Sequence, residues 1–196
     1  MPVEPTATTK TILRIGHCIP RAIRKGIFVS LFRLFYHAGV KNRLLALYNL
    51  QRSFPEKDSR EIIKIAKGVY RHFAIVAAEF FDMPFLTKDN IHEWVEIEGY
   101  ENYVEAIAKG RGLLSIVAHF GNWELLPIAV PIYAKPLHIV YRPLDNPMLD
   151  NLVEYVRTLY GNDLIPKGGS GKRIMELLRS EERRVGKRCR SRWSPY

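Results

Sequence analysis

The sequence has few cysteines and no long apolar run. Its 196 residues include two cysteines, Cys18 and Cys189, which lie far apart, with no Cys-x-x-Cys pair and no closely spaced histidines. A disulfide framework and a structural zinc site are therefore not indicated, and we expect no metal ligands. A mainly apolar stretch of fifteen residues lies between Lys25 and Lys41 and is broken by Arg33. It is too short for a spanning helix, which needs about 20 apolar residues.

Motifs of two other enzyme classes and a cleavable leader are also missing. Ser115 lies in an apolar run without the Gly-x-Ser-x-Gly pattern of a nucleophile elbow, which argues against a serine hydrolase. Residues 168–172 are rich in glycine but lack the Gly-x4-Gly-Lys-Ser/Thr spacing of a phosphate-binding loop. We also expect no cleavable signal peptide, because no apolar segment with a small-residue cleavage site follows residues 1–9.

The composition is that of a folded, basic protein. Hydrophobic residues make up 47% of the chain and aromatic residues 11%, which excludes global disorder. The net charge of +10 attracts phosphates, anionic lipids or nucleic acid equally well. Residues 181–196 contribute +4 of this charge and show no helix or strand periodicity. We interpret them as a non-native basic tail, with a basic arm that binds nucleic acid or membrane as the alternative.

Apolar periodicity divides the rest of the chain. A capping-box-like start at Asp58 opens a helix that we expect to run to about residue 80. Short strands are expected at 94–97, 113–118, 137–141 and 163–165. Helices are expected at 103–107 with Gly110 as C-cap, in part of 123–134 with interruptions at Pro127 and Pro131, from Asn146 to Gly161, and at 172–179. The alternation of strands and helices predicts an α/β fold with a partial parallel sheet flanked by helices.

We expect four segments. Residues 1–24 are polar and basic, 25–57 hold an interfacial helix and a connector, 58–180 form the α/β domain, and 181–196 are the tail. The 25–41 stretch has the composition of a helix that lies in the plane of lipid headgroups, although a core-packing helix fits the pattern about as well. Its apolar residues are Phe28, Leu31, Phe32, Leu34 and Phe35, and the surrounding basic residues are Arg14, Arg21, Arg24, Lys25, Arg33, Lys41 and Arg43.

The candidate chemistry lies where the apolar run 113–118 ends. Reactive groups in α/β proteins collect just past the carboxyl ends of buried strands, which is where His119 would lie. Glu124 follows five positions later, a spacing that does not place both residues on one face of a helix. If the turn around Gly121 brings them together, Glu124 accepts from one ring nitrogen of His119 and the other nitrogen serves as a base. A structural hydrogen-bonded pair is the alternative.

The residues around this turn resemble a known family. His119-Phe120-Gly121-Asn122-Trp123-Glu124 is similar to the His-x4-Asp/Glu signature of glycerolipid-type acyltransferases, and most similar to that of the bacterial lipid A late acyltransferases, which transfer lauroyl and myristoyl chains. The resemblance covers roughly residues 25–179. It includes, in the same order, Asn49-Leu50, Phe54-Pro55-Glu56, Val95-Glu96 with Gly99 and Glu101-Asn102, Gly110-Arg111-Gly112, Tyr141-Arg142-Pro143 and Asn146-Pro147.

The resemblance implies a glycerolipid-acyltransferase-like fold whose N-terminal helices associate with the cytoplasmic face of the bacterial inner membrane. It implies transfer of a fatty acyl chain from a thioester on acyl carrier protein to a hydroxyl of a membrane glycolipid such as a lipid A precursor. His119 would be the base and Glu124 its acidic partner, with no cofactor, no metal and no nucleic-acid partner. The implied substrate-binding residues are Arg142 and the turn residues Gly121, Asn122 and Trp123.

Two further expectations follow. The family continues beyond the α/β units seen here, so the resemblance implies a C-terminally truncated fragment, cut near Arg179. The competing interpretation of the whole chain is a non-catalytic basic protein that binds anionic membrane or nucleic acid. Under that interpretation, deleting residues 181–196 removes most of the binding and its salt dependence.

Overall fold

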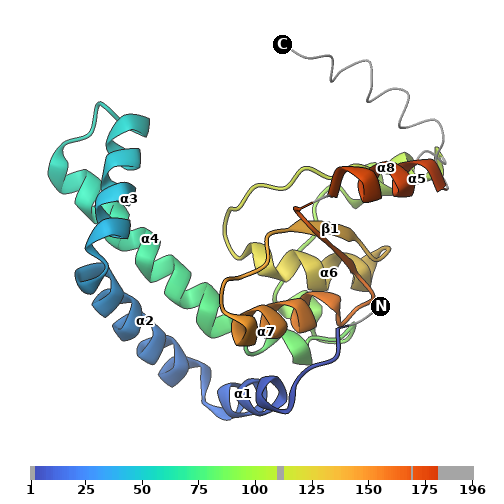
Figure 1. Cartoon of the computed structure of the whole chain (residues 1–196), viewed down its shortest axis with the longest axis horizontal. Coiled ribbons are helices and arrows are strands. Elements are labelled where there is room, and N and C mark those ends of the chain that lie inside the picture. Colours follow the sequence, from blue (N-terminus) through green and yellow to red (C-terminus); the bar gives the residue numbers. More distant parts are fainter. Residues whose placement is uncertain (1–2, 110–112, 169, 181–196) are drawn as a thin grey trace. The chain divides into compact units, whose positions relative to one another are not determined.

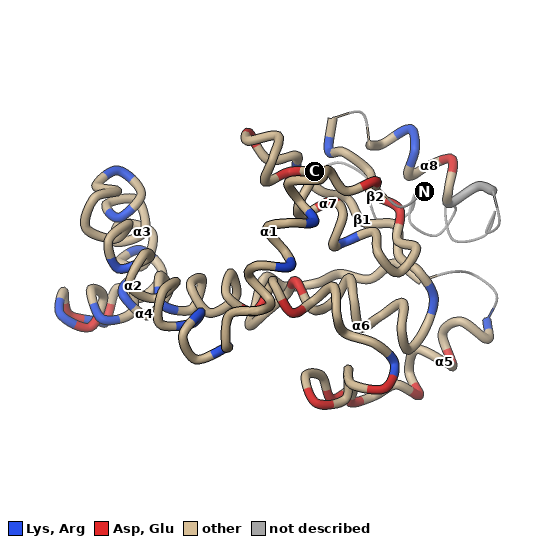
Figure 2. The backbone as a smooth tube through the Cα atoms, turned by 90° about the horizontal axis from the view of Figure 1, so that it is seen from below, with Lys and Arg blue, Asp and Glu red and all other residues tan. Residues whose placement is uncertain are grey.

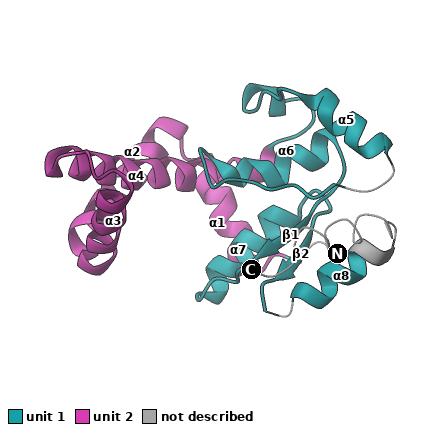
Figure 3. Cartoon of the chain, turned by 90° about the horizontal axis from the view of Figure 1, so that it is seen from above, with its two compact units in different colours: residues 1–4, 86–196 teal, residues 5–85 magenta. Residues whose placement is uncertain are grey.

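The computed structural model describes residues 3–109, 113–168 and 170–180, and these fall into two compact units (Figure 3). Residues 5–85 form a helical unit. Residues 86 onward, with the first four residues, form an α/β unit. The predicted Gly110 C-cap and the tail 181–196 lie outside the described residues.

The helical unit contains α1 (Ala7–Cys18), α2 (Arg21–Ala38), α3 (Val40–Ser53) and α4 (Ser59–Glu79), followed by the short 3₁₀ helix η1 (Met83–Phe85) (Figure 1). The predicted capping box at the start of α4 is confirmed. The Asp58 side chain accepts from the Glu61 backbone N–H, and the Glu61 side chain accepts from the Asp58 N–H. Both α2 and α3 pack on α4, which places α4 at the centre of this unit.

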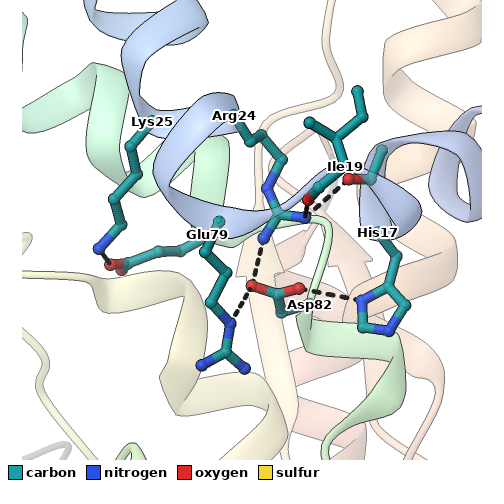
Figure 4. A network of polar contacts seen from close by, with 8 residues as sticks. His17, Ile19, Arg24, Lys25, Glu79 and Asp82 are labelled. Carbon is teal, nitrogen blue, oxygen red and sulfur yellow. Dashed lines mark hydrogen bonds and ion pairs between the residues drawn. The ribbon is translucent and has the colours of Figure 1, made fainter.

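A buried carboxylate joins the ends of three of these segments (Figure 4). Asp82 pairs with His17 Nδ1 at 2.9 Å, accepts from Arg21 Nε at 3.2 Å and accepts a further hydrogen bond from Arg24. Arg24 is 2% exposed and Asp82 3%, so this is a buried ion pair. Arg24 also donates to the Gly16 carbonyl at 2.7 Å and to the Ile19 carbonyl at 3.3 Å. Among the basic residues predicted to surround an interfacial helix, Arg24 is therefore buried, which does not fit a place among lipid headgroups.

The α/β unit has a parallel pair of strands, β1 (His138–Tyr141) and β2 (Asp163–Pro166), in register from His138 opposite Asp163 to Tyr141 opposite Pro166. The crossover between them is α7 (Pro147–Thr158), and α8 (Ser170–Ser180) follows β2. Ahead of β1 lie η2 (Ile91–Glu93), α5 (Tyr100–Ala108), η3 (Trp123–Leu125) and α6 (Leu126–Tyr133). A small parallel α/β element is thus confirmed.

The predicted boundaries of α7 are confirmed by its caps. The Asn146 side chain accepts from the backbone N–H groups of Met148 and Leu149, and Pro147 occupies the first turn. Asn146 was predicted as the N-cap on this ground, because a side-chain oxygen satisfies N–H groups that have no partner inside the helix. Gly161 follows the helix with φ of +85°, a backbone conformation that glycine tolerates best.

Three predictions about this unit are wrong. Residues 113–118 form no strand, and residues 94–97 likewise have no strand structure. Pro131 lies inside α6 and does not interrupt it. A strand needs a neighbouring backbone to pair with, and within the described residues the ladder joins β1 to β2 and does not extend to 113–118. An apolar run encodes a preference for burial, but it does not specify a pairing partner.

Candidate functional site

The turn that carries His119 is exposed and tightly bent. Residues 113–120 have exposed side chains and no regular secondary structure, and Ile116 and Phe120 are almost fully exposed. The Phe120 N–H donates to the Ala118 carbonyl at 2.9 Å, which closes a three-residue turn centred on His119. Gly121 then adopts φ of +59°, in the left-handed region where a Cβ is unfavourable. The imidazole of His119 is therefore accessible to a ligand.

Glu124 lies in η3 and is held from two directions. Its Oε2 accepts from Arg157 Nε at 2.9 Å, and its Oε1 accepts from the terminal NH2 of Arg157 at 2.5 Å. The indole Nε1 of Trp123 donates to Oε1 at 3.0 Å. The Glu124 side chain is 11% exposed and that of Arg157 is 20% exposed. A parallel pair of charge-assisted hydrogen bonds in this partly buried setting fixes both the position and the plane of the carboxylate.

His119 reaches this group through Trp123. The centroids of the two rings are 5.6 Å apart and the rings are tilted by 43°. Within the described residues, His119 and Glu124 form neither a hydrogen bond nor an ion pair, so the direct contact expected from the sequence is not present. An ionised carboxylate offers about four acceptor sites. In the part of the chain that the structure describes, Glu124 accepts three hydrogen bonds, one fewer than this number.

Arg157 is the site residue that sequence reasoning missed. It lies on α7 four positions after Val153 and one after Val156, on the edge of the predicted apolar stripe of that helix. A basic side chain at the edge of an apolar stripe needs an acidic partner when the helix packs. This position was the sequence signal that could have indicated a partly buried ion pair at Arg157. The partner itself is 33 residues away in the chain, so no local pattern identifies it.

Asn162 secures the backbone on both sides of this ion pair. It is 1% exposed, and its amide nitrogen donates to the Pro127 carbonyl at 2.6 Å and to the Arg157 carbonyl at 2.7 Å. Its amide oxygen accepts from the Leu137 N–H at 2.8 Å. One buried side chain therefore ties the start of α6, the end of α7 and the approach to β1 together.

Three of the four predicted substrate-binding residues lie in the turn beside His119, and the fourth, Arg142, lies in another segment. Gly121, Asn122 and Trp123 lie together in the turn beside His119, and Asn122 precedes η3. Arg142 follows β1, is 78% exposed and forms a 3.4 Å ion pair with Asp145. Because residues 113–118 form no strand here, sheet pairing does not bring Arg142 beside His119.

A shallow apolar pocket lies elsewhere in the α/β unit. Its volume is about 350 Å³ and it is lined by Ile97, Tyr100 and Tyr133. The Tyr100 hydroxyl donates to the Tyr133 carbonyl at 2.9 Å, so the polar end of this ring is satisfied. None of the six predicted site residues lines this pocket within the described part of the chain.

A second exposed surface lies on the helical unit. Its helices α2 and α3 expose large apolar side chains at helical spacing, namely Ile23, Ile27, Leu31, Leu34, Phe35, Val40, Leu44, Leu45 and Tyr48. Basic residues are spread along α2, α3 and α4, as the blue segments in Figure 2 show. Within the described residues no helix combines the length and the apolar character of a membrane span. We call the exposed residues named above the α2–α3 apolar surface.

Residues 8–186 match the family described as bacterial lipid A biosynthesis acyltransferase. Because this match covers far more than half of the chain, the protein belongs to that family.

Individual relatives are more distant. A lipid A biosynthesis acyltransferase of Haemophilus influenzae is 27% identical over 167 residues, which is 84% of this chain and 52% of that protein. The lipid A biosynthesis palmitoleoyltransferase of Escherichia coli K12 is 26% identical over 114 residues, 58% of this chain and 36% of the relative. The lipid A biosynthesis lauroyltransferase of the same organism is 27% identical over 133 residues, which is 68% of this chain and 43% of that relative. The chain spans about a third to a half of the length of these relatives.

Proposed function

We propose that the protein transfers a fatty acyl chain from a thioester, carried by acyl carrier protein, to a hydroxyl of a membrane glycolipid such as a lipid A precursor. Family membership supports the reaction class. The observation that carries the proposal is an accessible His119 whose ring lies against Trp123, the residue that also donates to Glu124, a carboxylate held in place by Arg157. This is the kind of arrangement that an acid-supported base requires.

The reaction needs one base and no covalent acyl-enzyme. A ring nitrogen of His119 takes the proton of the acceptor hydroxyl, and the hydroxyl oxygen attacks the thioester carbonyl carbon. The tetrahedral intermediate collapses as its C–S bond breaks, and the imidazolium returns the proton to the departing thiolate. The products are the new ester and the free thiol, and no cofactor takes part.

Charge develops twice along this path. Glu124 stabilises the imidazolium, and its remaining acceptor site allows a direct bond to His119 once substrate is bound, because catalytic hydrogen bonds often tighten only in the complex. The carbonyl oxygen becomes an oxyanion, for which backbone N–H groups at Gly121 and Asn122 and the guanidinium of Arg142 are our candidates. Arg142 is alternatively suited to a phosphate of the acceptor, since its planar fork matches that group. Trp123 borders the acyl path.

The helical unit supports attachment to a lipid surface. Residues 5–85 contain 14 Lys and Arg against five Asp and Glu, a net charge of +9. The α2–α3 apolar surface supplies side chains that enter the boundary between headgroups and acyl chains, while the basic residues attract anionic lipids. We infer attachment to the cytoplasmic face of the bacterial inner membrane.

The proposal is tested by following a labelled acyl group from an acyl carrier protein thioester to a lipid A precursor. We expect His119→Ala to lower the rate by about 10²–10⁴-fold, the usual contribution of a general base. His92→Ala is the matched control, because His92 is an exposed histidine on η2 of the same unit. Wild-type turnover in His119→Ala, with the control equally active, would refute the assignment.

A further inference from the structure

We propose that a row of basic side chains on α4 is the docking surface for the acidic acyl carrier protein that brings the thioester. The row consists of Arg60, Lys64, Lys67 and Arg71, all of them exposed, and we call it the α4 basic row. The inference rests on the proposed function for the identity of the donor. Its physical content, a line of positive charge that fits an acidic protein helix, comes from α4 itself.

The spacing of the four residues places them on one side of the helix. They follow one another at steps of four, three and four within α4. At 3.6 residues per turn they therefore lie within an arc of about 60° and extend for about 16 Å along the helix axis. Ile62 and Ala66, which are 3% and 0% exposed, lie on the opposite side. The α4 basic row thus faces away from the packed side of the first half of α4.

The charge of the α4 basic row is not neutralised by its own helix. Between Glu61 and Glu79 the sequence has no acidic residue. In the part of the chain that the structure describes, no ion pair involves the four cations, whereas Lys57 next to them along α4 pairs with Glu61 at 3.9 Å. Lys67 lies 6.0 Å from the centre of the Tyr36 ring, a contact that steadies the ammonium group and leaves its charge in place. The row therefore offers four positive charges to an external anion.

The composition of the row favours a protein over a bilayer as that anion. A helix that attaches to lipid presents apolar side chains beside its basic ones, as the α2–α3 apolar surface does. The large apolar side chains exposed on α4 are Ile63, Val69 and Phe73, and helical spacing places all three outside the arc of the row. A helix with carboxylates at the same helical spacing faces these cations along their whole length. The acyl carrier protein is the protein partner of the proposed reaction.

A glycine beside the row gives a second, independent indication. Gly68 is exposed and neighbours Lys64 and Arg71 on the helix surface, at four and three residues. A Cβ at Gly68 would meet no other part of the described chain within 4 Å. The packing of the protein therefore does not require glycine here, although glycine weakens a helix interior. The missing side chain allows another backbone to approach α4 closely.

Acyl transfer from two donors tests the docking role. The donors are lauroyl acyl carrier protein and lauroyl-pantetheine, which has the same thioester and no protein. Reversing two charges, with Lys64→Glu and Arg71→Glu in one chain, should raise KM for the carrier donor at least about tenfold, because attraction becomes repulsion. The values of kcat and of KM for lauroyl-pantetheine should not change.

The matched control reverses two charges elsewhere. Lys88→Glu with Lys135→Glu changes the net charge by the same amount at two exposed positions of the other unit, and should leave both donors unaffected. A rise in KM for the carrier donor that is equal in the two double variants would trace the effect to net charge and overturn the inference.

A change without charge tests the close approach. Gly68→Gln should raise KM for the carrier donor several-fold and leave KM for lauroyl-pantetheine as it is, because a side chain now stands where the partner helix packs. Gly26→Gln is its control, since Gly26 is also an exposed helix glycine with open space around it, on α2. Equal KM values for the carrier donor in the two glycine variants would contradict a close contact at Gly68.

Binding measured without turnover separates this inference from the proposed function. Fluorescence anisotropy of labelled acyl carrier protein, without lipid, should show binding to the wild type that weakens with salt and is lost in Lys64→Glu with Arg71→Glu. That result, combined with no acyl transfer by the wild type, refutes the proposed function only. Equal carrier binding by the wild type and the double variant overturns the docking role. So does a double variant that loses anionic-vesicle binding and transfer from both donors alike, because the row then serves lipid phosphates.

Discussion

The two units of this chain differ in charge and in what they expose. The helical unit, residues 5–85, carries +9, whereas residues 86–180 contain ten basic and twelve acidic residues and carry −2. The helical unit exposes apolar side chains at helical spacing on α2 and α3. The α/β unit concentrates its polar contacts around Glu124, Arg157 and Asn162. The basic, apolar surface that we propose to attach to lipid and the residues that we propose for acid–base chemistry thus lie in different parts of the sequence.

The largest expected effect concerns the buried ion pair of the helical unit. Asp82→Asn leaves Arg24 buried without a compensating charge, and breaking a buried pair in this way typically costs about 3–5 kcal/mol. We expect a loss of this size in the free energy of unfolding, measured by urea denaturation.

Glu79→Gln is the control for that change. Glu79 also pairs with a cation, Lys25, at 2.9 Å, but that cation is 44% exposed, and pairs of this kind contribute about 0–1 kcal/mol. Equal losses in the two variants would show that burial at Asp82 does not set the stability of this unit.

The next effect concerns binding to vesicles. Leu34→Glu removes one exposed apolar side chain from the α2–α3 apolar surface and adds a negative charge. Burying a leucine contributes about 1.5–3 kcal/mol, so we expect at least a tenfold loss of affinity for anionic vesicles in a sedimentation assay. Val104→Glu is a matched change at an exposed position of α5 in the other unit and should bind as the wild type does. Equal vesicle binding by Leu34→Glu and Val104→Glu would contradict a specific role of the α2–α3 apolar surface in attachment.

Salt should weaken the same binding by a smaller factor. Attraction between the charge of +9 and anionic lipids would act through solvent, and the screening length falls from about 10 Å at 0.1 M salt to about 3 Å at 1 M. We expect affinity for anionic vesicles to fall with salt and affinity for zwitterionic vesicles to stay low throughout. Binding to both lipids that is indifferent to salt would assign the attachment to the apolar residues alone.

The smallest effect is the alkaline stability of the α/β unit. Burial, together with the hydrogen bond that the Tyr141 hydroxyl donates to Glu154, raises the pKa of Tyr141 above its ordinary value of 10.0. Above pH 10 the unfolded chain loses this proton while the folded chain keeps it, so the stabilisation is complete below pH 10 and falls as the pH rises.

Tyr141→Phe removes this pH dependence. We therefore expect its free energy of unfolding to fall less steeply above pH 10 than that of the wild type, as followed by denaturant titration at several pH values. Identical slopes would show that the Tyr141 hydroxyl is not held in the folded state.

Local sequence patterns predicted where helices begin. The contacts of the candidate site depend on residues far apart in the chain, which local patterns do not specify. The capping box at Asp58 and the N-cap at Asn146 act within three residues, and both were found from the sequence. The run 113–118 has the composition of a buried strand, but strand formation depends on a partner backbone that composition does not specify.

The ion pairs show the same limit. Arg157 and Glu124 are 33 residues apart, and Arg24 and Asp82 are 58 apart. The place of Arg157 at the edge of an apolar stripe indicates that it needs an acidic partner, but nothing in the intervening chain identifies the partner in either pair. His119, Glu124 and the turn glycine could be predicted together because they lie in one compact motif. Arg157, the partner of Glu124, could be identified only from the fold.

We propose that the α/β unit carries the chemistry and that the helical unit carries the attachment to lipid. The most direct test measures acyl transfer to two acceptors, one embedded in anionic vesicles and one short-chained and soluble in water. We expect His119→Ala to lose transfer to both acceptors and Leu34→Glu to lose transfer only to the acceptor in vesicles. Transfer by His119→Ala at the wild-type rate, or an equal loss on both acceptors in Leu34→Glu, would contradict the separation of chemistry from attachment.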